Sequence, residues 1–144
     1  MMCYRRPESV LVVVHTPDQQ CLMIERVQPV GYWQSVTGGL EDNESALGCA
    51  QRELLEETGI NAMPEATGIV NRFKILQQWR SRYHPDDQEN TEYVYSVCLT
   101  EKVIPTLNPQ EHTQFAWLDA ATAMNRCFSR TNADAIKRIV LQQH

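Results

Sequence analysis

The feature that most constrains the fold is an unbroken apolar run at residues 9–15, which reads SVLVVVH. β-Branched side chains dominate this run, and they favour strands over helices. A strand with apolar side chains at successive positions has both of its faces buried, as the central strands of covered sheets do. Residues 9–15 therefore predict a buried central strand, which other elements of the chain cover.

Turn residues divide the remainder of the chain into further elements. The turn signal at residues 17–20 predicts a hairpin between the first strand and a second strand at residues 21–27. Further strands or extended segments are expected at residues 32–36, ended by Gly38 and Gly39, and at residues 67–76, 77–83, 91–99 and 114–118. Helices are expected at residues 45–58, 119–125 and 131–142, the last with Thr131 as its cap. This order predicts an α/β fold with a mixed sheet covered by helices, in one domain over residues 1–144.

Composition and charge narrow the classes of function. The net charge of −5 disfavours binding to duplex nucleic acid, which needs a basic surface. The chain has no apolar run of bilayer-spanning length and no polybasic run, and residues 10–14 are too few for a signal-peptide core. The five cysteines are scattered without a C-x-x-C pair, which is typical of reduced thiols. We expect a cytoplasmic protein without nucleic-acid or membrane partners.

The helix expected at residues 45–58 has two distinct faces. Its apolar stripe is formed by Ala46, Leu47, Ala50 and Leu54. Glu53, Glu56 and Glu57 are spaced i, i+3 and i+4, which places their carboxylates together on one side. Like charges repel, and the C-terminal end of a helix disfavours negative charge. Either Arg52 and solvent offset this acidic face, or a hard divalent cation such as Mg²⁺ binds its oxygens.

The entry to this helix favours the second interpretation. Gly38 and Gly39 follow a predicted strand, where glycine lets the backbone turn sharply and approach a ligand or a metal closely. Glu44 lies just before the helix, at the end that favours a carboxylate. Simple capping of the helix is an equally good interpretation of Glu44.

Together these residues form a longer motif: Gly38, five residues, Glu44, seven residues, then RELLEETGI at residues 52–60. The motif resembles the Nudix box of the Nudix hydrolases, with every fixed position filled. The resemblance implies an α/β/α sandwich with a catalytic loop–helix–loop, and hydrolysis of a nucleoside diphosphate linked to another group. It also implies that Glu53, Glu56 and Glu57 bind Mg²⁺, for which Mn²⁺ can substitute, and that Arg52 orients a glutamate.

Shorter matches along the chain resemble one subfamily, the dihydroneopterin triphosphate pyrophosphatases. They lie at residues 4–7, 33–38, 82–83, 90–92, 111–112, 117–120 and 131–132. The chain departs from the subfamily at Arg5, where a lysine is expected, and at Gly39, where serine is frequent. The resemblance adds Glu111 to the metal-binding and catalytic set, although a loop glutamate by itself is more often solvated.

Substrate contacts are expected from cations and from flat or apolar walls. Arg5 and Arg26 are the candidate phosphate contacts, because arginine binds phosphate through two hydrogen bonds. Thr37 is a candidate hydrogen-bond donor and Ser129 a candidate polar contact. The candidate wall of the ring pocket comprises Phe73, Lys74, Ile75 and Leu76. For Phe73 and Ile75, packing in the core is an equally good interpretation.

The resemblance predicts Mg²⁺-dependent hydrolysis of dihydroneopterin triphosphate to dihydroneopterin monophosphate and pyrophosphate. One glutamate of the cluster, or Glu111, would be the general base. Two alternatives stay open: a Nudix enzyme that acts on dNTPs, ADP-ribose or dinucleoside polyphosphates, and a non-catalytic Nudix binding module. The expected partner is a small-molecule triphosphate, and assembly as a homodimer is left open.

Overall fold

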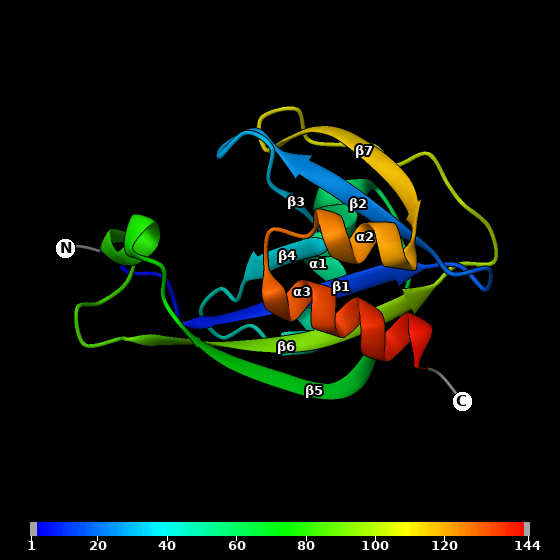
Figure 1. Ribbon diagram of the computed structural model, residues 1–144. Coiled ribbons are helices and arrows are strands. Elements are labelled where there is room, and N and C mark those ends of the chain that lie inside the picture. The colour runs from blue at the N-terminus through cyan, green and yellow to red at the C-terminus, as the bar shows by residue number, and fades with distance from the viewer. Residues whose placement is uncertain (1–2, 143–144) are drawn as a thin grey trace.

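The fold is built on a seven-stranded mixed sheet, seen in a computed structural model that describes residues 3–142 (Figure 1). The strand order is β3-β2-β1-β6-β5, with β4 paired to β1 and β7 paired to β2. The strands are β1 (Glu8–His15), β2 (Gln20–Arg26), β3 (Trp33–Gln34), β4 (Val36–Gly39), β5 (Glu65–Lys74), β6 (Glu89–Cys98) and β7 (His112–Asp119). The helices are α1 (Ala46–Thr58), α2 (Ala120–Arg126) and α3 (Arg130–Ile136), with short segments η1 (Gln77–Arg82) and η2 (Lys137–Leu141).

Strand β1 is the central strand that its apolar run predicts. It pairs in parallel with β6 and antiparallel with β2 and β4, so the sheet is mixed. The predicted hairpin between β1 and β2 is confirmed, with His15 opposite Cys21. Within β1, Val10, Val12 and Val14 belong to one hydrophobic core, whereas Leu11 and Val13 belong to another.

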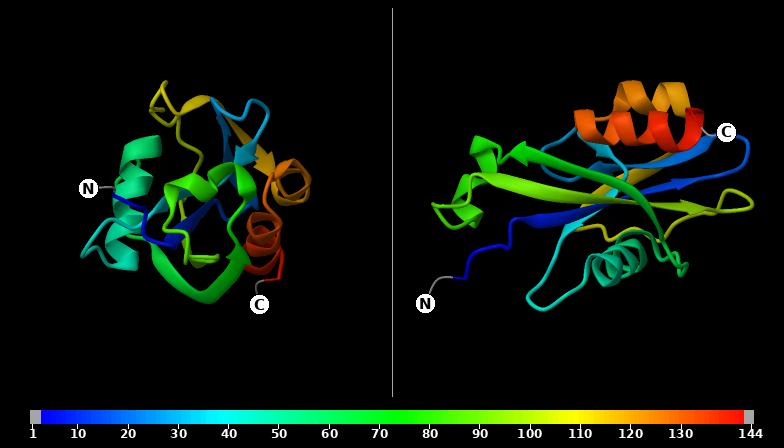
Figure 2. Two further views of the ribbon diagram at one scale, coloured as in Figure 1. Left: turned by 90° about the vertical axis from the view of Figure 1, so that its left-hand side faces the viewer. Right: turned by 90° about the horizontal axis from the view of Figure 1, so that it is seen from below.

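Each core lies under its own helical layer, so the structure is an α/β/α sandwich. Figure 2 shows α1 on one face of the sheet, and α2 and α3 on the other. The first core contains Cys49, Ala50 and Leu54 of α1, and the second contains Ala135 and Ile136 of α3. Alternating side chains of β1 therefore enter both cores, which explains why its sequence is apolar without interruption.

Four local predictions are wrong. Residues 77–82 form the 3₁₀ helix η1 rather than an extended segment, because this polar stretch lacks the alternation that a paired strand needs. Strand β4 continues through Gly38 and Gly39, since both pair with β1. Ser129, not Thr131, caps α3 by accepting a hydrogen bond from the backbone of Asn132. The Leu47 side chain is exposed, because it lies outside the stripe that packs on the sheet.

The structure also bears on the predictions from composition. The five cysteines are free, and Cys21 and Cys49 are buried. Within residues 3–142, no helix has the length and apolar character that crossing a bilayer requires.

Candidate active site

Helix α1 is fixed at both ends, which sets the direction of its carboxylates. At its start, the Ser45 hydroxyl accepts a hydrogen bond of 3.0 Å from the N–H of Gly48. At its end, Gly59 has the left-handed backbone (φ 74°) that glycine readily adopts, and its N–H donates to the Leu55 carbonyl. The apolar stripe of α1 packs on the sheet, and Glu53 and Glu57 lie beside it, with Glu53 against Gly38 of β4 and Glu57 buried.

Arg52 connects the helix to the loop that precedes it. Its Nε and Nη2 atoms bind the two oxygens of Glu44 at 2.7 and 2.9 Å. Its Nη2 also donates to the Gly39 carbonyl at 3.2 Å, and its Nη1 donates to Glu53 Oε1 at 2.6 Å. The hydrogen bonds from Arg52 lower the pKa of Glu44 to about 2. Glu44 therefore holds Arg52 in place, and the capping role falls to Ser45.

Gly38 makes room for the Glu53 carboxylate. A Cβ atom at position 38 would collide with Oε2 and Cδ of Glu53, so a larger residue there would displace the carboxylate. A Cβ atom at Gly39 would meet Nη2 of Arg5 at 2.9 Å, which places that guanidinium group above β4. The two glycines thus lie against one predicted metal ligand and one predicted phosphate contact.

Glu57 is the most unusual side chain of the cluster. It is 2 % exposed, and its Oε1 atom has no hydrogen-bond partner. Burial raises the pKa of Glu57 well above its usual range, as do a hydrogen bond with Glu53 and the negative charges of Glu53 and Glu111. A buried carboxylate beside two others is costly without a cation.

His112 lies beside Glu57 but does not supply that cation. Its Nε2 atom is 3.7 Å from Glu57 Oε1. Burial, together with the positive charge of Arg26, lowers the pKa of His112 to about 4. The ring is therefore neutral at neutral pH, and the pair is not an ion pair. Sequence analysis assigned His112 no role in the site, although residues 111–112 are one of the short matches to the subfamily.

The donor set fits a hard divalent cation. Across residues 3–142, no three acidic, histidine or cysteine side chains are already arranged to hold an ion. Mg²⁺, however, keeps several waters and is commonly held by one or two carboxylates together with substrate phosphates. The unpaired Oε1 of Glu57 and the crowding by Glu53 and Glu111 are what such an ion would relieve. Glu56 is more exposed and is held by Arg52 at 3.3 Å.

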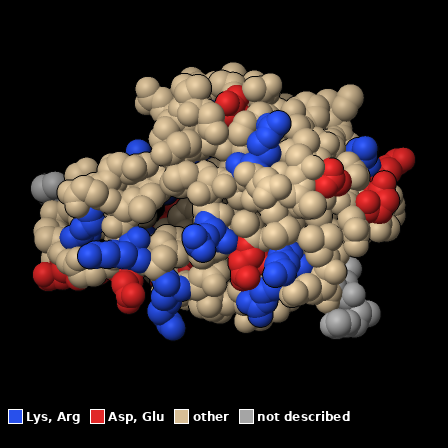
Figure 3. Space-filling view, in the orientation of Figure 1, with Lys and Arg blue, Asp and Glu red and all other residues tan. Residues whose placement is uncertain are grey.

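Arginines gather next to these carboxylates. Burial and the charges of Arg82 and Arg5 lower the pKa of Arg26, whereas Glu57 and Glu111 raise it. Arg82 and Arg5 are also joined through their backbones by a hydrogen bond of 2.7 Å. Figure 3 shows a hollow beside η1 with lysine and arginine side chains on its rim. Sequence analysis missed Arg82, because nothing in the sequence indicates that η1 brings it beside Arg5.

The remaining candidate contacts have partners within the fold or lie on β5 and just after it. The Thr37 hydroxyl donates to the Val10 carbonyl at 2.8 Å, and the Thr37 backbone interacts with Glu57. The Ser129 hydroxyl accepts from Asn132 and shares a hydrogen bond with Thr131. Among the proposed ring contacts, Phe73 is half-buried, Ile75 is buried, and Lys74 and Leu76 are exposed.

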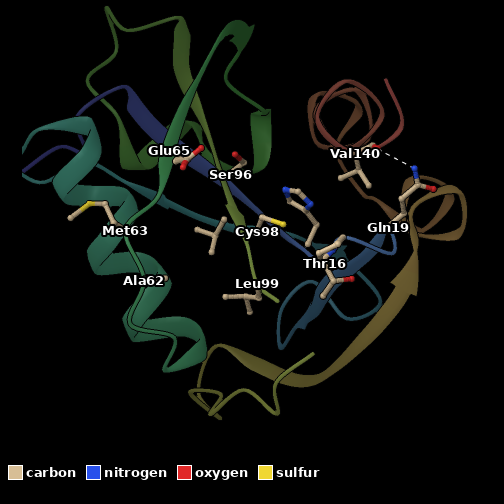
Figure 4. Close-up of a pocket in the computed structure, with 12 residues that line it drawn as sticks. Thr16, Gln19, Ala62, Met63, Glu65, Ser96, Cys98, Leu99 and Val140 are labelled. Carbon is tan, nitrogen blue, oxygen red and sulfur yellow. Dashed lines mark hydrogen bonds between the residues drawn. The ribbon is translucent and has the colours of Figure 1, made fainter. Parts of the chain in front are cut away.

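A separate cavity of about 560 Å³ lies elsewhere in the molecule (Figure 4). It is bounded by the end of β1, by the segment between α1 and β5, and by the end of β6, and Gln19 donates across it to the Val140 carbonyl at 3.4 Å. None of the candidate site residues lines this cavity. The predicted metal ligands Glu53, Glu56 and Glu57 lie instead on α1, where Glu53 borders Gly38 of β4.

Comparison with known proteins agrees with this geometry. A family profile of the NUDIX domain matches residues 5–142. The dihydroneopterin triphosphate diphosphatase of Haemophilus influenzae is 34 % identical over 96 % of this chain and 90 % of its own length. The enzyme of the same name from Escherichia coli K12 is also 34 % identical, over 96 % of this chain and 95 % of its own length.

Solved structures give the same result. The E. coli dihydroneopterin triphosphate pyrophosphohydrolase superposes with a TM-score of 0.91 and 32 % identity, covering 99 % of this chain and 100 % of the other. A Nudix hydrolase structure from Listeria monocytogenes superposes at 0.80 with 20 % identity over 95 % of this chain and 94 % of its own, which supports the fold alone. From the box geometry and the matched family profile, we conclude that this chain belongs to the Nudix family.

Proposed function

We propose that this Nudix protein hydrolyses dihydroneopterin triphosphate to dihydroneopterin monophosphate and pyrophosphate. The water oxygen forms a bond to phosphorus, one phosphoanhydride P–O bond breaks, and the proton released from water passes to a basic group. The observation that carries the proposal is the buried, partly unpaired carboxylate of Glu57 between two other carboxylates and beside Arg26. The names of the H. influenzae and E. coli relatives support the choice of substrate.

The metal is proposed to be Mg²⁺, with Mn²⁺ as a substitute. Glu53, Glu56, Glu57 and Glu111 are the proposed ligands, all with the hard oxygen donors that Mg²⁺ prefers. A bound divalent cation neutralises charge on phosphate oxygens and lowers the pKa of a bound water.

The other residues bind and orient. Arg52 holds Glu53 through a charge-assisted hydrogen bond and, through Glu44, fixes the loop against the helix. One glutamate of the cluster, or Glu111, accepts the proton of the attacking water. Arg5 and Arg26 bind the phosphates, and Arg82 adds to their positive charge. Thr37, Ser129 and the four residues 73–76 remain candidate substrate contacts.

The proposed enzyme is one catalytic domain over residues 1–144. Its proposed partner is a small-molecule substrate, and its proposed location is the cytoplasm. Its test is a pyrophosphate-release assay with Mg²⁺ over dihydroneopterin triphosphate, the dNTPs, ADP-ribose and diadenosine polyphosphates. We expect kcat/KM for the pterin to exceed the others by orders of magnitude. A preference for another substrate would reject the pterin, and no turnover of any would favour a binding module.

Variants of the helix test the roles of the residues in the same assay. Glu53→Gln and Glu57→Gln each keep the size of the side chain and remove its charge. Both are expected to lose most of the turnover in Mg²⁺, because metal ligands act as a unit. Glu65→Gln is the matched control, since Glu65 is an exposed glutamate at the start of β5. Full turnover by either helix variant would reject the assignment.

A further inference from the structure

Three aromatic side chains from separate segments meet at the surface. Tyr32 lies between β2 and β3, Trp79 lies in η1, and Phe128 lies between α2 and α3. The rings of Tyr32 and Phe128 are stacked, with centroids 4.0 Å apart and planes at 16°. The rings of Trp79 and Phe128 meet edge to face at 6.2 Å. We call these three residues the aromatic cluster.

The aromatic cluster is not part of either hydrophobic core. Neither core includes any of its members, although Trp33 and Cys127, the sequence neighbours of Tyr32 and Phe128, pack against one of them. Phe128 is 37 % exposed, and Tyr32 and Trp79 are only partly buried. Packing of the core therefore does not account for the position of these rings.

Arg26 joins the aromatic cluster to the carboxylates. Its guanidinium carbon lies 5.5 Å from the centroid of the Trp79 ring, in a cation–π arrangement. Its charge also interacts with those of Glu57, Glu111, Arg5 and Arg82. A molecule with phosphates at the arginines would thus have its remaining part directed toward these rings.

We propose that the aromatic cluster binds the fused ring of the substrate by stacking, with Arg26 between the ring and the phosphates. This inference rests on the proposed function, whose substrate joins a flat bicyclic ring to a triphosphate. Stacking of a nucleobase on an aromatic side chain is typically worth about 5- to 150-fold in affinity. Stacking of the ring on the cluster would contribute that gain in affinity. The glutamates and arginines would contribute only through the phosphates.

The alternative is a purely structural role, in which the cluster fastens η1 to the segment between α2 and α3. The two roles differ in what they affect. A structural fastening supports η1, which positions Arg82 beside Arg5, so its loss weakens phosphate binding and ring binding together. Loss of a stacking surface weakens the binding of a ring and leaves the binding of a phosphate chain intact.

Calorimetry on the chain of residues 1–144 in Mg²⁺ separates these roles through two probes. Neopterin has the ring without phosphates, and inorganic triphosphate has the phosphates without a ring. In Phe128→Ala, we expect the Kd of neopterin to rise about 5-fold or more and the Kd of triphosphate to change less than 2-fold. Phe128→Tyr keeps an aromatic face and is expected to restore neopterin binding. Ile104→Ala, at an exposed apolar residue outside the cluster, controls for loss of apolar surface.

Each outcome decides the inference. Wild-type protein that does not bind neopterin at millimolar concentration, or a Phe128→Ala variant that binds it normally, would overturn the proposal. A parallel loss of both probes, with failure of Phe128→Tyr to restore either, would assign the cluster to structure. Neopterin has no phosphoanhydride bond and cannot be turned over, so its binding can be interpreted even if the substrate panel shows no hydrolysis of the pterin.

Discussion

Arg52 and Glu44 form a two-pronged ion pair across eight residues, with N–O distances of 2.7 and 2.9 Å. The pair closes the loop between β4 and α1, because the same guanidinium group also binds the Gly39 carbonyl and Glu53. Arg52 of α1 therefore binds both the loop before the helix, through Glu44, and strand β4, through Gly39. Its position follows from the box spacing, but its partners become visible only in three dimensions.

Removing one side of this pair tests its contribution to stability. Glu44→Gln is expected to lower the free energy of unfolding by about 1.5–3 kcal/mol, the range for hydrogen bonds to charged groups. Urea unfolding measures the loss. Glu41→Gln is the matched control, because Glu41 is exposed and lies 3.5 Å from Arg52, so a change of about 0.5 kcal/mol or less is expected. Equal losses in both variants would contradict this role for Glu44.

The same pair predicts a pH dependence. The folded-state pKa of Glu44 is about 2, below its ordinary value of 4.5, so its contribution is complete above 4.5. It is lost progressively as pH falls through the interval from 4.5 to about 2. The difference in unfolding free energy between wild type and Glu44→Gln should therefore be constant from pH 7 to 5 and shrink below. Chemical unfolding at a series of pH values measures it, and a difference that grows on acidification would reject this linkage.

Gly38 and Gly39 should differ in their tolerance of alanine. In Gly38→Ala the new Cβ atom meets the Glu53 carboxylate, which is confined by Arg52, so we expect turnover to fall at least about tenfold. In Gly39→Ala the new atom meets the end of the flexible Arg5 side chain, which can move at low cost. A change in KM without a large loss of kcat is expected there. Steady-state kinetics of both variants provide the measurement.

Glu57→Gln is expected to have opposite effects on stability and activity. Without a divalent ion, replacing a buried carboxylate beside Glu53 and Glu111 removes repulsion and a desolvated charge, so stability should rise by about 1 kcal/mol. Added Mg²⁺ should raise the Tm of wild type through preferential binding to the folded state and have little effect on the variant. Calorimetry with EDTA and with Mg²⁺ tests both parts. A variant less stable than wild type in EDTA would contradict the strained-carboxylate interpretation.

Asn132 is expected to matter for stability. It is buried, its Oδ1 atom accepts from the Ser35 N–H at 2.8 Å, and its Nδ2 atom donates to the Ser35 hydroxyl at 2.9 Å. Asn132→Ala should cost about 1–3 kcal/mol, because the backbone N–H of Ser35 is left buried without a partner. Asn125→Ala, at an exposed position on α2, is the control and should change little. Thermal unfolding compares the two.

Structural features that follow from the local spacing of apolar and charged residues were predictable from the sequence. The β-branched run predicted β1, and the spacing of Ala50 and Leu54 predicted the buried face of α1. The shared face of Glu53, Glu56 and Glu57 needed nothing beyond helical geometry.

Features that depend on tertiary contacts were not predictable in this way. The polar sequence of η1 argues against a paired strand, but the hydrogen bond from Arg5 to Arg82 that joins η1 to a distant segment could not be predicted from it. Ser129 rather than Thr131 caps α3, because α3 begins at Arg130, a boundary that the sequence pattern did not locate. Burial of Glu57, whose Oε1 atom has no hydrogen-bond partner, depends on how the surrounding segments pack, and the sequence does not show it.

The alternation of side chains along β1 has a consequence for how this enzyme can change over evolutionary time. Val12 faces the layer that contains the glutamates of α1, whereas its neighbour Val13 faces the layer of α2 and α3, next to which Phe128 lies. Substitutions that reshape the second layer are buffered from the first by a rigid sheet. Changes in the packing of α2 and α3 can therefore accumulate by drift on one side, while the packing of α1 on the other side is inherited intact.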